Sequence, residues 1–253
     1  MSNPVRYAVP TAGVGVIEIN RPDAHNAINC EVQQGIASIL DTVETDPSIR
    51  CLVLAGAGGR AFSAGWDITE LVGFSDKELA KTQSEREEWL WRWYSFPIPT
   101  IVALRGLSHG VGSYLAVSAD LRVGGPGTRF QVTASSYGGA GLTWLLPDVV
   151  GNHYAKDILF TARVIEGPEC RDMGLLSRYV ADDDEIVGTA TALASQIAVL
   201  PPNGVQNAKR LLRERAGRST REQYDEENRV TAAMGASASE LFSGFLTRKS
   251  SQR

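Results

Sequence analysis

Two glycine-containing loops carry the residues of this sequence that are best placed to do chemistry. The stretch AFSAGWD (61–67) follows the apolar run CLVLA, and SHGVGSY (108–114) follows the apolar run TIVAL. Gly110 and Gly112 let the backbone amide of Val111 point outward at the start of a predicted helix, where N–H groups are free and the helix dipole is positive. Two such loops facing each other would hold a developing oxyanion between two backbone N–H groups, which suits a thioester carbonyl that becomes an enolate. The same glycines would also serve a purely structural role in tight strand-to-helix turns.

The segment GAGGRA (56–61) matches a dinucleotide-binding fingerprint because it directly follows a predicted strand. That fingerprint requires a helix to open at the turn and an acidic residue about 20 residues further on. Here the sequence continues as FSAGWD, without a helical period, which argues against a nicotinamide or flavin site.

The segment GLSHG (106–110) matches the nucleophile elbow of serine hydrolases and lies between a predicted strand and a predicted helix. A catalytic triad would need a histidine later in the chain. After His109 that leaves His153, and the final hundred residues contain none. A serine hydrolase therefore stays an alternative with no evident base.

The elements that must position these loops alternate between strands and helices over the first two thirds of the chain. Strands are predicted at 13–20, 51–56, 100–104, 120–125, 129–134 and 177–181, and a helix capped by Asn29 runs through Val43. Ser75 is predicted to cap a charged helix that ends before Pro97. The segment after Asn152 is mostly helical, with breaks predicted at EGPEC, PPNG and AGRST. This order favours an α/β core with a helical C-terminal part, and adjacent strands would place both loops at one sheet edge.

Composition excludes several classes of protein. The 253 residues are 43% apolar and carry a net charge of -4 without a basic block, which argues against nucleic acid as a partner. The three cysteines are sparse and widely spaced, as in reduced intracellular proteins, and the three scattered histidines make a metal site improbable. No apolar run approaches the roughly 20 residues of a membrane helix, and the start MSNPVRYAVP lacks the apolar part of a secretory signal. We therefore expect a cytoplasmic protein without a membrane partner.

Four stretches together resemble the crotonase superfamily, the enoyl-CoA hydratases and isomerases: INRPDAHNAIN, AFSAGWDITEL, PTIVALRGLSHGVGSYLAVSADLRV and LFTARVIEGPECRDMGLLSRYV. The resemblance implies an α/β crotonase (ClpP-like) spiral of ββα units with a C-terminal helical region. It implies a core over residues 1–195 that carries the coenzyme A and oxyanion-hole loops, and a helical trimerisation region over 196–253. The implied assembly is a homotrimer or a dimer of trimers, and the implied substrate is an acyl-CoA, with no further cofactor.

The resemblance also assigns roles to individual residues. The oxyanion hole falls on the backbone N–H groups of Trp66 and Val111. The coenzyme A side follows Ala24, Ala64, Asp67 and Ile68, and Phe245 matches a position in the last helix that reaches coenzyme A, often from a neighbouring subunit.

The sequence departs from the family where hydratases carry two glutamates. Tyr114 stands at the first position and Ala134 at the second, and no Asp or Glu lies between Asp120 and Asp148. Two side chains are left as candidates for proton transfer. Tyr114 lies one turn inside the helix that starts at the oxyanion hole, and His109 precedes the hole and titrates near neutral pH.

These departures leave three functions open. The first is an active enzyme that is not a standard hydratase: a decarboxylase, a C–C hydrolase or an isomerase that relies on enolate stabilisation. The second is a true hydratase or isomerase that uses other residues, and the third is an acyl-CoA binding protein without catalysis. Loss of CO2 is attractive because it generates an enolate without a base.

Overall fold

The computed structural model describes residues 3–233 of the chain. By compactness the chain divides into a first unit that ends at Val205 and a second that begins at Gln206, and each is described here by itself. Residue 195, where a boundary was predicted, lies inside helix α7 (Ile186–Ala198), which belongs to the first unit.

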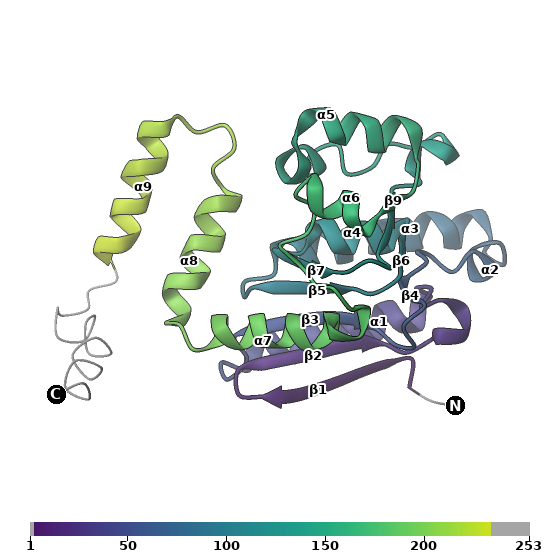
Figure 1. The fold of residues 1–253 in the computed structure, drawn as a ribbon, viewed down its shortest axis with the longest axis horizontal. Coiled ribbons are helices and arrows are strands. Elements are labelled where there is room, and N and C mark those ends of the chain that lie inside the picture. Colours follow the sequence, from purple (N-terminus) through teal and green to yellow (C-terminus); the bar gives the residue numbers. More distant parts are fainter. Residues whose placement is uncertain (1–2, 234–253) are drawn as a thin grey trace. The chain divides into compact units, whose positions relative to one another are not determined.

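The first unit is built on a six-stranded sheet (Figure 1). Its strands, in spatial order, are β1 (Val5–Thr11), β2 (Val14–Ile19), β3 (Cys51–Gly56), β5 (Thr100–Leu104), β7 (Leu121–Gly124) and β10 (Arg178–Tyr179). β1 pairs antiparallel with β2, and the other neighbours pair in parallel. All residues of β3 and β5 are buried, as expected for parallel strands that are covered on both faces.

After each of three strands of the first sheet, the chain forms a strand of a second, smaller sheet. It contains β4 (Ala61–Ser63), β6 (Leu107–His109), β8 (Arg129–Gln131) and β9 (Ile165–Glu166), in that order. Within the described residues, β3 is thus followed by β4, β5 by β6 and β7 by β8, and a helical segment comes after each pair. This strand–strand–helix repeat confirms the predicted spiral of ββα units.

Helices cover both faces of the large sheet. The α-helices of the first unit are α1 (Cys30–Thr45), α2 (Ile68–Leu71), α3 (Asp76–Ser95), α4 (Val111–Ser118), α5 (Leu146–Thr161), α6 (Gly167–Asp172) and α7, with 3-10 turns η1 (Pro22–Ala24), η2 (Ala134–Tyr137) and η3 (Asp183–Glu185). Alternate β3 residues face opposite ways: Val53 packs in the cluster that contains α7, and Leu52 packs in the cluster that contains α1, α3 and α4. Because successive side chains of a strand point to opposite faces, β3 contributes to two separate hydrophobic clusters.

Local signals explain where several helices begin. The Asn29 side chain accepts a hydrogen bond from the Val32 N–H at 3.0 Å, and Ser75 forms a capping box with Glu78, so both predicted caps are confirmed. The break predicted at EGPEC is present but lies slightly earlier, over 162–166, and α6 starts at Gly167 within the motif. Pro168 lies in the first turn, where the N–H that proline lacks has no intrahelical partner.

The second unit contains the end of α8 (Pro202–Arg213) and α9 (Thr220–Ala233). Arg210 pairs with Glu214 at 3.0 Å and with Glu226 on α9 at 3.6 Å, which links the two helices. Phe245, which was predicted to reach coenzyme A, lies outside the described residues.

Candidate active site

The two glycine-containing loops lie side by side. β3 and β5 are parallel neighbours, with Leu52 opposite Thr100, so their carboxyl ends meet at one edge of the large sheet. The chain then enters β4 and β6, which again pair in parallel, with Ala61 opposite Leu107. The expectation that both loops share one edge is therefore confirmed.

Gly65 sits where the loops touch, with φ +98°. A Cβ atom at this position would lie 3.0 Å from the His109 carbonyl oxygen and 3.3 Å from the Val111 nitrogen. A side chain would therefore push the loop that carries Trp66 away from the start of α4. Glycine is needed here both for the left-handed backbone and for the close approach.

The N–H groups of Trp66 and Val111 both remain available. Val111 is the first residue of α4, where an N–H has no intrahelical acceptor. The Ile28 N–H donates to the Gly65 carbonyl at 2.8 Å and the Asp67 N–H donates to the Ile28 carbonyl at 2.9 Å, so the short ladder beside Trp66 does not use the Trp66 N–H. Among residues 3–233, neither N–H donates to another group of the chain.

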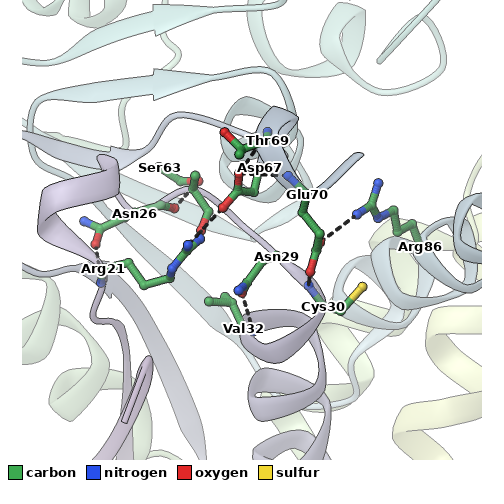
Figure 2. A network of polar contacts seen from close by, with 11 residues as sticks. Arg21, Asn26, Asn29, Cys30, Val32, Ser63, Asp67, Thr69, Glu70 and Arg86 are labelled. Atoms are coloured by element: carbon green, nitrogen blue, oxygen red, sulfur yellow. Dashed lines mark hydrogen bonds and ion pairs between the residues drawn. The ribbon is translucent and has the colours of Figure 1, made fainter. Parts of the chain in front are cut away.

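A buried asparagine joins the loop to the segment that precedes α1. The Asn26 amide donates to the carbonyl oxygens of Ala57 (2.9 Å) and Ala61 (2.7 Å), and its own oxygen accepts from the Arg21 N–H at 3.0 Å. The Ser63 hydroxyl donates to the Asn26 carbonyl at 2.9 Å (Figure 2). These bonds explain the HNAIN segment, which sequence reasoning matched to the family without a structural role.

Asp67 holds the far side of the loop. Its carboxylate accepts from the N–H groups of Thr69 (3.1 Å) and Glu70 (3.4 Å), which caps α2. It also pairs with Arg21 at 2.9 Å (Figure 2). Arg21 in turn donates to the Ala27 carbonyl at 2.7 Å. The backbone on either side of Trp66 is therefore fixed by buried or half-buried polar contacts.

The Trp66 indole is held from α3. The Arg86 guanidinium carbon lies 4.0 Å from the Trp66 ring centroid, in a cation–π arrangement, and the Trp89 ring lies 6.0 Å away. Glu70 pairs with Arg86 at 3.6 Å and accepts from the Cys30 N–H at 3.0 and 3.1 Å, as Figure 2 shows. Sequence reasoning missed Glu70 and Arg86, because they lie on separate helices. Only tertiary packing brings them together and buries Arg86.

A cavity of about 390 Å³ opens beside the two free N–H groups. It is lined by residues of the two loops, α2, α3, α4 and the segment after β8: Trp66, Leu71, Leu79, Gln83, Arg86, Glu87, Leu90, Gly110, Val111, Tyr114, Val132, Thr133 and Ala134. The structure thus brings together Trp66, Val111 and Tyr114 of the predicted site, and Ala134 lines the same cavity. The predicted positions His109, Ala24, Ala64, Asp67 and Ile68 are not among the described lining residues.

The Tyr114 phenol is oriented by a backbone group. Its oxygen accepts a hydrogen bond from the Leu142 N–H at 3.0 Å. Burial raises the pKa of the Tyr114 phenol, and the Leu142 hydrogen bond only partly opposes this. Because the phenol stays protonated at neutral pH and its oxygen already accepts one bond, its O–H is available to donate.

His109 and Ser108 lie on β6, and neither is among the described residues that line the cavity. Burial lowers the pKa of the His109 imidazole, which is therefore neutral at pH 7, and its Nε2 is buried without a partner among the described residues. Ser108 is fully buried, and its hydroxyl likewise has no partner in the described part of the chain. Within residues 3–233, the serine of the GLSHG motif therefore has no base within hydrogen-bond reach.

Acidic side chains are scarce in the cavity. Glu87 is the one carboxylate among the described lining residues. No group of three or more histidines, cysteines or acidic residues in the described part of the chain is arranged to hold a metal ion. Within residues 3–233, no helix is both long enough and apolar enough to span a membrane.

The size of Gly112 is a constraint on the same site. A Cβ at this position would lie 2.5 Å from the Ser63 carbonyl oxygen, where overpacking typically costs about 1–3 kcal/mol. We expect Gly112→Ala to lower the midpoint of thermal unfolding by several degrees. Gly188→Ala on α7 is the matched control, because nothing lies within 4 Å of its added methyl group. An unchanged midpoint for Gly112→Ala would show that β4 and α4 are not tightly packed.

The fold is similar to that of solved protein structures. The structure superimposes on the crystal structure of an enoyl-CoA hydratase from Bacillus anthracis with a TM-score of 0.90, covering 98% of this chain and 96% of that one at 23% identity, which shows the likeness of the fold. The two sheets, the repeated strand–strand–helix unit and the paired loops define a crotonase fold.

Sequence similarity narrows this class to a family. Residues 10–251 match the family model described as enoyl-CoA hydratase/isomerase. The chain is 30% identical over 249 residues to the 1,2-epoxyphenylacetyl-CoA isomerase of Escherichia coli (strain K12), covering 95% of this chain and 94% of that protein. It is 33% identical over 203 residues to the 2,3-dehydroadipyl-CoA hydratase of the same strain, covering 79% and 78%. The chain therefore belongs to the enoyl-CoA hydratase/isomerase family.

Proposed function

We propose that this protein is an enzyme that acts on an acyl-CoA thioester and stabilises the enolate form of its acyl group. The observation that carries the proposal is the contact at Gly65, which sets the Trp66 loop against the free N–H of Val111. A thioester oxygen bound by both N–H groups would receive two hydrogen bonds that strengthen as negative charge develops on it. The positive end of α4 acts in the same direction.

The proton is best supplied by Tyr114. Its side chain lines the cavity, its orientation is set by Leu142, and burial keeps it protonated. A phenol with a raised pKa is a poor base and a competent donor, so it suits a step in which an enolate carbon takes up a proton. His109 remains a second candidate, although it is not among the described residues that line the cavity.

The reaction proposed is not the addition of water by a pair of carboxylates. Tyr114 and Ala134 stand where the family's hydratases carry glutamates, and both line the cavity. In a decarboxylation, the bond between Cα and the carboxylate breaks, its electron pair enters the thioester enolate, and CO2 leaves. Cα then takes the Tyr114 proton, which solvent replaces. A C–C hydrolysis or an isomerisation would use the same oxyanion site.

Coenzyme A is proposed to lie along Ala24, Ala64, Asp67 and Ile68, outside the cavity. The exposed Ile68 side chain and the fixed Asp67 loop support this placement, since coenzyme A needs an open, rigid surface. The proposal retains a homotrimer or a dimer of trimers and a cytoplasmic location, both as expected from the family resemblance.

Titration with acetyl-CoA and hexanoyl-CoA is expected to give saturable binding in calorimetry and a higher melting temperature, since a ligand that binds only the folded state stabilises it. Free coenzyme A is the control that separates recognition of the carrier from recognition of the thioester. Absence of heat and of stabilisation at millimolar ligand would contradict the proposed function. Binding without turnover of any thioester would favour an acyl-CoA binding protein without catalysis.

A further inference from the structure

Arg122 is a buried cation at the C-terminal end of α4. It lies on β7, and its residue is 6% exposed. Its Nη1 donates to three backbone carbonyl oxygens at this end of the helix, those of Ala119 (2.8 Å), Ala116 (3.1 Å) and Val117 (3.4 Å). Its Nε donates to the Leu175 carbonyl oxygen at 2.7 Å. Arginine is rarely buried to this degree without a paired charge, so a guanidinium that binds neutral carbonyl oxygens calls for an explanation.

The carbonyl groups that Arg122 binds belong to the negative end of the α4 dipole. The last carbonyl groups of a helix have no intrahelical partner and carry a partial negative charge. The Leu115 carbonyl at the same end accepts the Trp93 indole N–H at 3.0 Å. The other end of this helix begins at Val111, with its free N–H beside the cavity. Arg122 therefore neutralises the end of α4 that would oppose the positive potential at the oxyanion site.

The charge of Arg122 is close enough to act at the oxyanion site. The helix α4 has eight residues and is therefore about 12 Å long. At that separation, and with an effective dielectric constant of about 20, two unit charges change an equilibrium constant about tenfold. Because Val111, Leu115 and Ala116 of this helix are buried, little water lies between its two ends to screen the interaction.

The guanidinium keeps its charge at neutral pH. Burial lowers the pKa of Arg122 to about 10, and the nearby Asp120 carboxylate acts in the opposite direction. Asp120, between α4 and β7, accepts hydrogen bonds from the Thr100 N–H (2.8 Å) and the Thr100 hydroxyl (3.1 Å). Asp120 is exposed, so water screens its negative charge more than it screens the buried guanidinium. The positive charge at this end of α4 is therefore only partly compensated.

We propose that Arg122 is a positioning residue of the oxyanion site, whose charge acts through α4 on an oxygen bound at the Val111 N–H. An enolate oxygen is then stabilised more than the neutral oxygen of the thioester, although Arg122 touches neither. This inference rests on the proposed function, since it takes the Val111 N–H as an oxyanion donor.

The probe for this effect is acetoacetyl-CoA, a thioester with a Cα–H between two carbonyl groups that ionises to an enolate with its own ultraviolet absorbance. Titration of this absorbance against pH, with and without excess protein, gives the acidity of the bound and the free ligand. We expect the unmodified protein to make the bound ligand more acidic than the free one. Arg122→Met removes the charge and is expected to lower the acidity of the bound ligand about tenfold. Arg178→Met on β10, the strand next to β7, is the control and should leave this acidity unchanged.

Asp120→Asn tests the same charge effect with Arg122 in place. It keeps an oxygen for the Thr100 N–H and removes a negative charge from the C-terminal end of α4. At low ionic strength, where an exposed charge acts over a longer distance, the bound ligand is expected to become about twofold more acidic. This variant decides the question if Arg122→Met does not fold.

The acidity of the bound ligand separates the charge effect from a structural role. If Arg122→Met binds acetoacetyl-CoA more weakly but leaves the acidity of the bound ligand unchanged, Arg122 is purely structural and the proposal is overturned. An unchanged acidity in Asp120→Asn at low ionic strength would overturn it as well. If the unmodified protein does not bind acetoacetyl-CoA, or does not make it more acidic, the result contradicts the proposed function instead, because no oxyanion is then stabilised.

Discussion

Val111→Pro is expected to lower turnover of the substrate about 10²- to 10³-fold, the usual effect of removing one oxyanion donor. Proline replaces the N–H of Val111 with a ring carbon and so removes one hydrogen bond to the thioester oxygen. Val111 is the first residue of α4, where proline is compatible with the helix. Steady-state kinetics measures the loss, and circular dichroism checks that the helix content is retained.

Val111→Ala is the matched control, because it keeps the N–H and removes only two methyl groups. It is expected to retain most of the activity and to cost some stability, since the Val111 side chain is buried. A folded Val111→Pro protein with full activity would mean that the glycine turn is only a turn. Tyr114→Phe and His109→Ala then separate the two candidate proton donors, and loss of activity in His109→Ala alone would assign the proton to the histidine.

Hydration of crotonyl-CoA is expected to be slower than in a two-glutamate hydratase by several orders of magnitude. General acid and base groups typically contribute about 10²- to 10⁴-fold each, and the family resemblance predicts Tyr114 and Ala134 at the positions of the two glutamates. The measurement is the loss of the enoyl-thioester absorbance over time, with a two-glutamate hydratase as the reference. A kcat near ~10 s⁻¹, the middle of the range for ordinary enzymes, would contradict this account of the site.

Glu87 offers a way to interpret residual hydration. It is a carboxylate at the cavity wall, on α3 rather than at either glutamate position of the family. If slow hydration is observed and Glu87→Gln abolishes it, a single displaced carboxylate is the base. Glu85→Gln on the exposed side of the same helix is the control, because Glu85 does not line the cavity.

Strong local signals made much of the fold predictable. The apolar runs of β3 and β5, the caps at Asn29 and Ser75, and the glycines of both loops each act over a few residues, and the structure has them as expected. The three-residue strands β4 and β6 were not predicted, because pairing with neighbouring strands alone fixes such short segments. β1 was missed because its residues are mostly exposed and it is an edge strand that takes its register from β2.

The polar side chains that α3 contributes to the cavity lining could not be predicted from the sequence. The helix α3 has the composition of a solvated surface helix, and the burial of Arg86 follows from Trp66 and Glu70, which approach it from other parts of the chain. A charged residue in a charged helix gives no local sign that tertiary packing will bury it. By contrast, strand adjacency predicted that the two loops share one edge, and the family resemblance assigned Trp66, Val111 and Tyr114 to the site that they form there.

The Gly65 contact determines which positions of the two loops can accept substitutions during evolution. The two N–H groups that it brings together belong to the main chain, so nearly any residue at 66 or 111 would present them. Substitutions at these two positions can therefore change the shape of the cavity while both N–H groups stay in place. The constraint falls instead on Gly65 and Gly112, where an added Cβ would lie 3.0 and 2.5 Å from backbone carbonyl oxygens. Related proteins could therefore keep the backbone geometry that holds the two N–H groups while the side chains that set substrate preference change.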